Sequence, residues 1–197
     1  MKRLVLAGAG HAHALVLRQL AQAPLAGVEV VVVSPEPLAP YSGMVPGWLA
    51  GLYSFDDTVI DMPPLARAAG ALWRQTALQA IDPACRQLQL ADGTVLDYDV
   101  LSLNVGSTLR PPAAQHAWML PLRPLSLLRQ RLDQLLDLAA RDSGLGSVTA
   151  VGGGAAGFEA LLALLQRLRR LQPGRRIQGR LITRSQALFP GLSSAAR

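Results

Sequence analysis

Two glycine-rich turns, far apart in the chain, constrain its fold more than any other feature. The first occupies residues 8–10 and follows the apolar run Leu4–Ala7. The second occupies residues 152–157, has the spacing Gly-x-Gly-x-x-Gly and follows the apolar run 148–151. A strand, a glycine turn and a helix in this order bring backbone N–H groups and the positive end of a helix dipole to one point, which suits a pyrophosphate. Each turn therefore predicts a βαβ unit that binds a dinucleotide.

Composition agrees with a globular α/β protein. Half of the 197 residues are hydrophobic, and no apolar stretch reaches the roughly 18 residues that span a bilayer. The lone Cys85 precludes an internal disulfide or dithiol pair. The net charge is +6, but the arginines are scattered and aromatic residues make up only 5%, so nucleic-acid binding is not expected. His11 and His13 have no carboxylate or cysteine nearby in sequence, so no metal site is expected.

The first βαβ unit is predicted from a strand over Leu4–Ala7, a helix over Ala12–Ala23 and the β-branched strand 28–33. A proline-rich loop follows. Three short strand candidates, 71–81, 86–90 and 94–98, predict a small antiparallel β-meander inserted in the α/β domain. The last two are joined by an Asp-Gly hairpin turn. A buried strand over Asp99–Asn104 completes this part.

The second βαβ unit follows an amphipathic helix predicted over Leu125–Arg141. Its strands are predicted over Val148–Val151 and Gly179–Thr183, with a helix over Phe158–Arg170 between them. We therefore expect one domain over residues 1–112 and a second over residues 113–197. The sequence stops soon after the second strand of this unit, and we interpret the second domain as incomplete and the chain as a fragment.

Both units depart from the usual dinucleotide pattern. The first has His13 where a third glycine normally allows close packing of helix on strand, so its imidazole must be accommodated by spacing or by pointing aside. Its second strand ends in Ser34, with Glu36 two residues on, and either could hydrogen-bond an adenosine ribose hydroxyl. Neither unit has the acidic residue that usually ends the second strand, and in the second unit Arg184 follows that strand. Two interpretations stay open: Arg184 binds a 2′-phosphate and favours NADP, or it is a solvated surface arginine.

Together these segments resemble the pyridine nucleotide-disulfide oxidoreductase superfamily, flavoproteins with two dinucleotide-binding domains. The stretch Tyr98–Ser107 is similar to the family's strand and glycine turn beside FAD, with Asn104-Val105 in place of Ala-Thr. Within the superfamily, residues 8–13 and the segment Pro40–Gly47 most resemble a type II NADH dehydrogenase-like branch, found alone or fused ahead of selenide, water dikinase.

The resemblance implies a Rossmann-like FAD-binding domain with an antiparallel β-meander insertion, followed by an incomplete Rossmann-like NAD(P)-binding domain. It implies hydride transfer from NAD(P)H to flavin, with electrons passed on to a small-molecule acceptor, either a quinone or a sulfur or selenium species. The acceptor, the choice of NAD or NADP, a homodimer and contact with a membrane surface are left open. The protein is expected in the cytoplasm or at the periphery of the inner membrane.

Site residues follow from the same resemblance, with Glu36 added from its place after the second strand. The residues expected to contact FAD are Gly8, Gly10, His11, Ser34, Glu36, Tyr41, Ser42, Gly43, Met44, Leu78 (through its backbone) and Gly106. Those expected to contact NAD(P)H are Gly152, Gly154 and Gly157. Glu159 is the candidate catalytic residue facing the nicotinamide and flavin rings; the alternative is a carboxylate that only interacts with the helix dipole.

Two further functional hypotheses remain. The chain could be a catalytically incomplete nucleotide-binding fragment, or a flavin-free NAD(P)-binding Rossmann protein. The predicted meander and the turn at residues 105–107 argue against the second of these.

Overall fold

A computed structural model describes residues 1–107, 118–141 and 145–184. The chain divides into two compact units, Met1–Tyr41 with Val59–Ser107 and Ser42–Thr58 with Thr108–Arg197. The boundary predicted between residues 112 and 113 lies outside the described residues. The membership of 42–58 in the second unit has no counterpart in the sequence prediction. That each unit binds its own nucleotide stays a prediction.

The first unit is built on a four-stranded parallel sheet in the order β5-β2-β1-β9. Its strands are β1 (Lys2–Ala7), β2 (Val28–Val33), β5 (Leu72–Arg74) and β9 (Val100–Leu103). In β1, Val5 pairs with Val31 on one side and with Leu101 on the other. The two central strands carry long apolar runs because both faces of a parallel sheet are covered.

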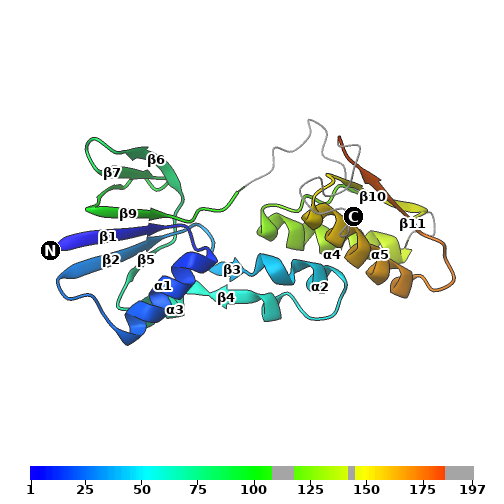
Figure 1. The fold of residues 1–197 in the computed structure, drawn as a ribbon, viewed down its shortest axis with the longest axis horizontal. Helices are drawn as coiled ribbons and strands as arrows, with labels where there is room; N and C mark the ends of the chain where they lie inside the picture. Colours follow the sequence, from blue (N-terminus) through cyan, green and yellow to red (C-terminus); the bar gives the residue numbers. More distant parts are fainter. Residues whose placement is uncertain (108–117, 142–144, 185–197) are drawn as a thin grey trace, which may run out of the picture. The chain divides into compact units, whose positions relative to one another are not determined.

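Different layers cover the two faces of this sheet, as Figure 1 shows. Helices α1 (His11–Gln22) and α3 (Met62–Ala68) pack on the face that presents Leu6 and Val32. An antiparallel meander packs on the face that presents Val5 and Val31. Its strands are β6 (Leu78–Asp82), β7 (Gln87–Leu90) and β8 (Val95–Asp97). The predicted α/β domain with a meander insertion is therefore present.

Two local predictions need correction. The strand predicted over 71–81 is two strands: β5 joins the parallel sheet and β6 joins the meander. A tight turn separates them, in which the Thr76 N–H donates to the Arg74 carbonyl at 3.0 Å. The proline-rich region predicted as a loop contains β3 (Leu38–Pro40), which pairs antiparallel with β4 (Val59–Asp61). Between these two strands lie the short helices η1 (Ser42–Met44), α2 (Val45–Leu49) and η2 (Asp56–Thr58).

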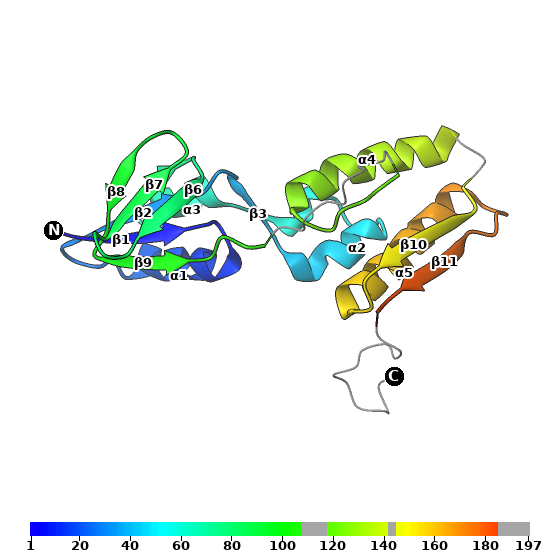
Figure 2. The same ribbon diagram turned by 90° about the horizontal axis from the view of Figure 1, so that it is seen from above.

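The second unit contains a parallel pair of strands, β10 (Ser147–Val151) and β11 (Gln178–Ile182), seen side by side in Figure 2. Helix α5 (Ala155–Leu171) connects them and buries Leu161 and Leu165. Helix α4 (Leu125–Arg141) has the bounds predicted from its periodicity. Helix α2 packs against α5, and the Arg167 guanidinium donates to the Trp48 carbonyl at 3.1 Å.

Candidate functional site

The first glycine turn lies where β1 ends, between neighbours β2 and β9 on either side. Gly8 has φ +95°, and its N–H donates to the Val33 carbonyl at 2.7 Å. A Cβ atom at Gly8 would lie 2.1 Å from the carbonyl oxygen of Asn104. At Gly10, the N-cap of α1, a Cβ would lie 2.4 Å from the Asn104 side chain. Both glycines are therefore required by close contact with the end of β9, at the switch point where α/β sheets bind ligands.

His13, at the position of the missing third glycine, is turned into the protein rather than aside. Its side chain is 1% exposed. The ring Nδ1 lies 2.6 Å from the Gly8 carbonyl oxygen, and Nε2 lies 2.9 Å from the Ser102 hydroxyl oxygen. The imidazole therefore connects the glycine turn to β9, and both ring nitrogens have partners, as buried polar groups require.

His11 stands directly after Gly10 at the start of α1. Its ring contacts the ring of Tyr41, with centroids 4.8 Å apart and planes inclined by 53°. The buried Nε2 atom of His11 has no hydrogen-bond partner among the described residues. A buried polar atom without a partner is costly, so this atom suits a hydrogen bond from a bound group.

The end of β2 carries the two residues predicted for the ribose. Ser34 is 4% exposed, and its hydroxyl donates to the Glu36 carbonyl at 3.1 Å. Glu36 itself is exposed. Because Ser34 is buried and the Glu36 carboxylate is exposed, Glu36 is the better candidate of the two to accept a hydrogen bond from a ribose hydroxyl.

The remaining residues predicted for FAD fall in three places. Leu78 begins β6 and packs on the meander face of the sheet. Gly106 follows β9 with φ +75°, and no atom lies within 4 Å of the place that a Cβ would take, so the requirement for glycine there is conformational. Ser42, Gly43 and Met44 form η1 and belong to the second compact unit, whereas Tyr41 belongs to the first.

The second glycine turn has the geometry that its complete motif predicts. Gly152 has φ +126°, and its N–H donates to the Ile182 carbonyl at 2.8 Å. A Cβ at Gly157 would lie 2.5 Å from the Gly152 carbonyl oxygen, whereas Gly154, the N-cap of α5, has open space around it. The third glycine therefore allows helix packing, and the second leaves room for a ligand.

The end of β11 lies against this turn. A Cβ at Gly153 would lie 2.3 Å from the Thr183 hydroxyl oxygen, so the strand end and the turn are in close contact. Arg184 follows directly and is exposed. This is the place where a dinucleotide-binding unit meets the adenosine ribose.

The helix predicted from Phe158 would place Glu159 in its first turn, and this placement is wrong. Helix α5 begins at Ala155, three residues before the predicted start, so the first turn contains no acidic residue. Glu159 is exposed and lies beyond the zone where a carboxylate gains most from the helix dipole. The purely structural explanation of this residue is therefore weakened.

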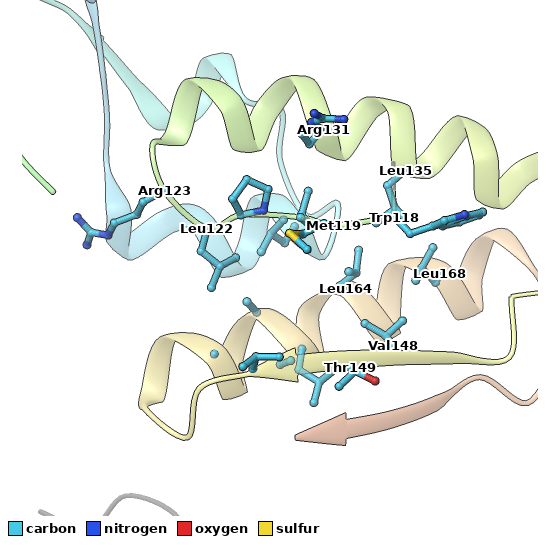
Figure 3. A pocket seen from close by; sticks show the side chains of 18 of the residues that line it. Trp118, Met119, Leu122, Arg123, Arg131, Leu135, Val148, Thr149, Leu164 and Leu168 are labelled. Atoms are coloured by element: carbon cyan, nitrogen blue, oxygen red, sulfur yellow. The ribbon is translucent and has the colours of Figure 1, made fainter. Parts of the chain in front are cut away.

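A separate apolar cavity of about 800 Å³ lies within the second unit, shown in Figure 3. Trp118 and Met119 from the segment before α4, Leu135 of α4, Val148 of β10 and Leu164 of α5 line it. Gly157 reaches this cavity, but Gly152 and Gly154 do not line it. Its walls are mainly apolar, with Arg123 and Arg131 at the lining.

Cys85 lies in the turn between β6 and β7 and is exposed. A hydrogen bond to Asp82 raises the pKa of its thiol, and the nearby carboxylate charge adds to this. A raised pKa disfavours the thiolate that nucleophilic chemistry requires. Across residues 1–107, 118–141 and 145–184, no cluster of three or more metal-ligating side chains occurs, and no helix is long and apolar enough to cross a membrane.

Sequence reasoning did not identify Ser102 and Asn104 as site residues. Both lie on or just after β9, two positions apart, which places them on the same face of the strand. The available signal was two polar side chains at a spacing of two in an otherwise apolar strand. Their partners, His13 and Gly10, lie far earlier in the chain, so that neighbouring residues carry no sign of these contacts.

The chain is similar in sequence to one curated protein and similar in fold to several solved structures. No family model matches the chain. A probable ferredoxin reductase, CtmF, from Castellaniella defragrans is 29% identical over 170 residues, which cover 83% of this chain and 40% of that protein.

Several solved structures have a similar fold. The structure of NDH2 from Plasmodium falciparum in complex with NADH superposes with a TM-score of 0.76 and 14% identity, covering 98% of this chain and 44% of that one. The covalent putidaredoxin reductase–putidaredoxin complex gives 0.73 and 20% identity, covering 98% and 45%. The chain thus spans less than half the length of these proteins.

Proposed function

We propose that this chain, whose fold resembles part of a pyridine nucleotide-disulfide oxidoreductase, is the nucleotide-binding portion of an FAD-dependent NAD(P)H oxidoreductase. The observation that carries the proposal is that the same strand–turn–helix arrangement occurs in both units. In each unit a glycine turn joins a parallel strand to a helix and is pressed against the end of a neighbouring strand. Two such turns in series suit two nucleotides between which electrons pass.

The first unit is proposed to hold FAD. Gly8 and Gly10 allow the backbone to approach the pyrophosphate, and Glu36 reaches the adenosine ribose. The Nε2 atom of His11, which has no partner among the described residues, forms a hydrogen bond with the bound nucleotide. Among these features, the buried Nε2 of His11 without a partner is the one that a bound group would satisfy. When bound, the flavin supplies the hydride acceptor.

The second unit is proposed to hold NAD(P)H. The open space at Gly154 receives the pyrophosphate at the start of α5, and Gly157 keeps α5 close to the turn. Glu159, exposed on α5, is proposed to face the reacting rings and to position the nicotinamide. The chain's own residues are proposed to orient the nucleotides, while the cofactors would carry out the chemistry.

The acceptor is proposed to be a small redox molecule, a quinone or a sulfur or selenium species. The similarity to a probable ferredoxin reductase adds a ferredoxin-type iron–sulfur protein as a second candidate. Steady-state reduction of a quinone, of polysulfide and of a ferredoxin by the full-length protein would distinguish these classes.

The proposed function is tested by visible absorbance of the purified chain after FAD addition and gel filtration. We expect the chain to retain a flavin spectrum that bleaches on anaerobic addition of NADH or NADPH. Retained flavin without bleaching would mean that the second unit does not deliver hydride in this chain. A colourless chain that still binds NAD(P)H would favour the flavin-free Rossmann alternative.

Arg184 is proposed to bind the 2′-phosphate of NADP. We expect Arg184→Ala to weaken NADPH binding by about tenfold, because a charge-assisted hydrogen bond is lost, and to leave NADH binding within about twofold. Isothermal titration with both nucleotides measures this. Arg176→Ala, another exposed arginine of the same unit, is the matched control. Equal effects of R184A on NADH and NADPH would assign Arg184 to the solvated surface instead.

A further inference from the structure

His13 stands at the position where the dinucleotide motif normally has a glycine, yet it is among the most buried residues of the first unit. A carbonyl oxygen only accepts hydrogen bonds, so the 2.6 Å contact with Gly8 requires that Nδ1 carries the hydrogen. In the neutral ring Nε2 is then an acceptor, and the Ser102 hydroxyl donates to it across 2.9 Å. One ring therefore fixes two groups from opposite ends of the first unit's sequence.

The contact with Gly8 determines the orientation of one peptide group in the turn. In a trans peptide the C=O and the N–H point in opposite directions. With the Gly8 carbonyl held toward His13, the N–H of Ala9 points away from the buried ring. The hydrogen bonds of α1 begin only with the N–H groups of His13 and Ala14, which both donate to Gly10. The N–H groups that precede them in the turn lie before the helix ladder.

The opposite side of the turn is fixed by β9. Gly8 packs on the Asn104 backbone, and Gly10 packs on the Asn104 side chain. Ser102 and Asn104 lie on the same face of β9, so this strand holds the turn at two points, through His13 and through Asn104. A turn held at two points loses little conformational entropy when an anion binds.

We propose that His13 is a positioning residue, which uses the Nδ1–H to hold the Gly8 carbonyl inward and so presents the N–H groups of the glycine turn to the pyrophosphate of FAD. Ser102 sets the ring tautomer by donating to Nε2. The histidine thus replaces the close packing of a third glycine with a directed hydrogen bond. The proposal rests on flavin binding by the first unit, and it names the residue that prepares the turn for it.

The test uses two replacements, each of which places a hydrogen-bonding amide near one of the two ring nitrogens. Asparagine carries an amide N–H near the place of Nδ1, and glutamine carries its amide near the place of Nε2. We expect His13→Asn to bind FAD within about threefold of the unchanged protein, and His13→Gln to bind it at least about tenfold more weakly. Ser102→Ala should weaken FAD binding less than H13Q does, because only the part of the population that shifts to the Nε2–H tautomer loses the bond to Gly8.

Binding of NADPH by the second unit is the control for general loss of folding, and thermal unfolding without FAD compares the stabilities of the variants. Equal losses of FAD affinity in H13N and H13Q, or losses that follow the fall in melting temperature, would overturn the positioning role.

A second measurement needs no flavin. Nitrogen NMR of the histidine-labelled chain should show the His13 ring protonated at Nδ1 and bare at Nε2, and Ser102→Ala should raise the Nε2–H tautomer. A ring protonated only at Nε2 would overturn the proposal, since the Gly8 carbonyl could not then accept from it. If the unchanged chain shows the Nδ1–H tautomer but retains no FAD, the proposed function fails while the link between His13 and the turn stands.

Discussion

Gly8→Ala is expected to abolish FAD binding and to lower the free energy of unfolding of the first unit by about 2–5 kcal/mol. The φ of +95° costs an alanine about 1–2 kcal/mol. The new methyl group would also lie 2.1 Å from the Asn104 carbonyl oxygen, which is backbone and cannot rotate away. Overpacking of this kind adds about 1–3 kcal/mol. Urea unfolding followed by circular dichroism, with FAD titration of the folded protein, measures both effects.

Gly27→Ala is the matched control for this substitution. Gly27 also has a left-handed φ, of +72°, but nothing lies within 4 Å of a Cβ placed there. Its alanine variant should lose only about 1–2 kcal/mol and keep its FAD affinity. If both variants lost the same stability and both kept FAD, the contact between Gly8 and β9 would have no role in the site.

Gly157→Ala is expected to weaken NAD(P)H binding at least about tenfold and to destabilise the second unit by about 1–3 kcal/mol. The added methyl group would lie 2.5 Å from the Gly152 carbonyl oxygen, so α5 must move away from the turn. That movement shifts the helix N-terminus away from the pyrophosphate. Fluorescence titration with NADPH and thermal unfolding measure the two effects.

Gly154→Ala separates ligand approach from packing in the same turn. Gly154 has φ −83° and open space around it, so alanine should leave stability within about 0.5 kcal/mol. It should nonetheless weaken NAD(P)H binding, because its methyl group enters the space left for the nucleotide. A G154A variant with unchanged affinity would place the nucleotide elsewhere on the unit.

The elements that sequence predicted well are those whose signals are local. The valine run of β2 and the leucine spacing of α4 are read from neighbouring residues, and both elements have the predicted bounds. The strand predicted over 71–81 was wrong because a turn at Arg74–Thr76 directs its two halves into different sheets. Periodicity does not reveal which sheet a short strand will join.

The glycines of both turns could be predicted as well, because their requirement is encoded in spacing. His13 could be singled out as a departure, but its role could not be predicted, since it depends on Ser102, 89 residues away. The same applies to Arg167, which bonds to Trp48 from 119 residues further along the chain. Contacts of this range are set by the assembled fold and leave no periodic pattern.

The membership of residues 42–58 in the second unit has a consequence for how such a protein can be recombined. Because Pro40 pairs with Val59 across β3 and β4, the segment leaves and re-enters the first unit at adjacent points, as an inserted loop does. A single crossover near residue 107 would therefore leave the buried Trp48 and Leu49 without the α5 surface that α2 covers. Exchange of one compact unit between related genes requires two further junctions, one on each side of this segment, so that α2 travels together with α5.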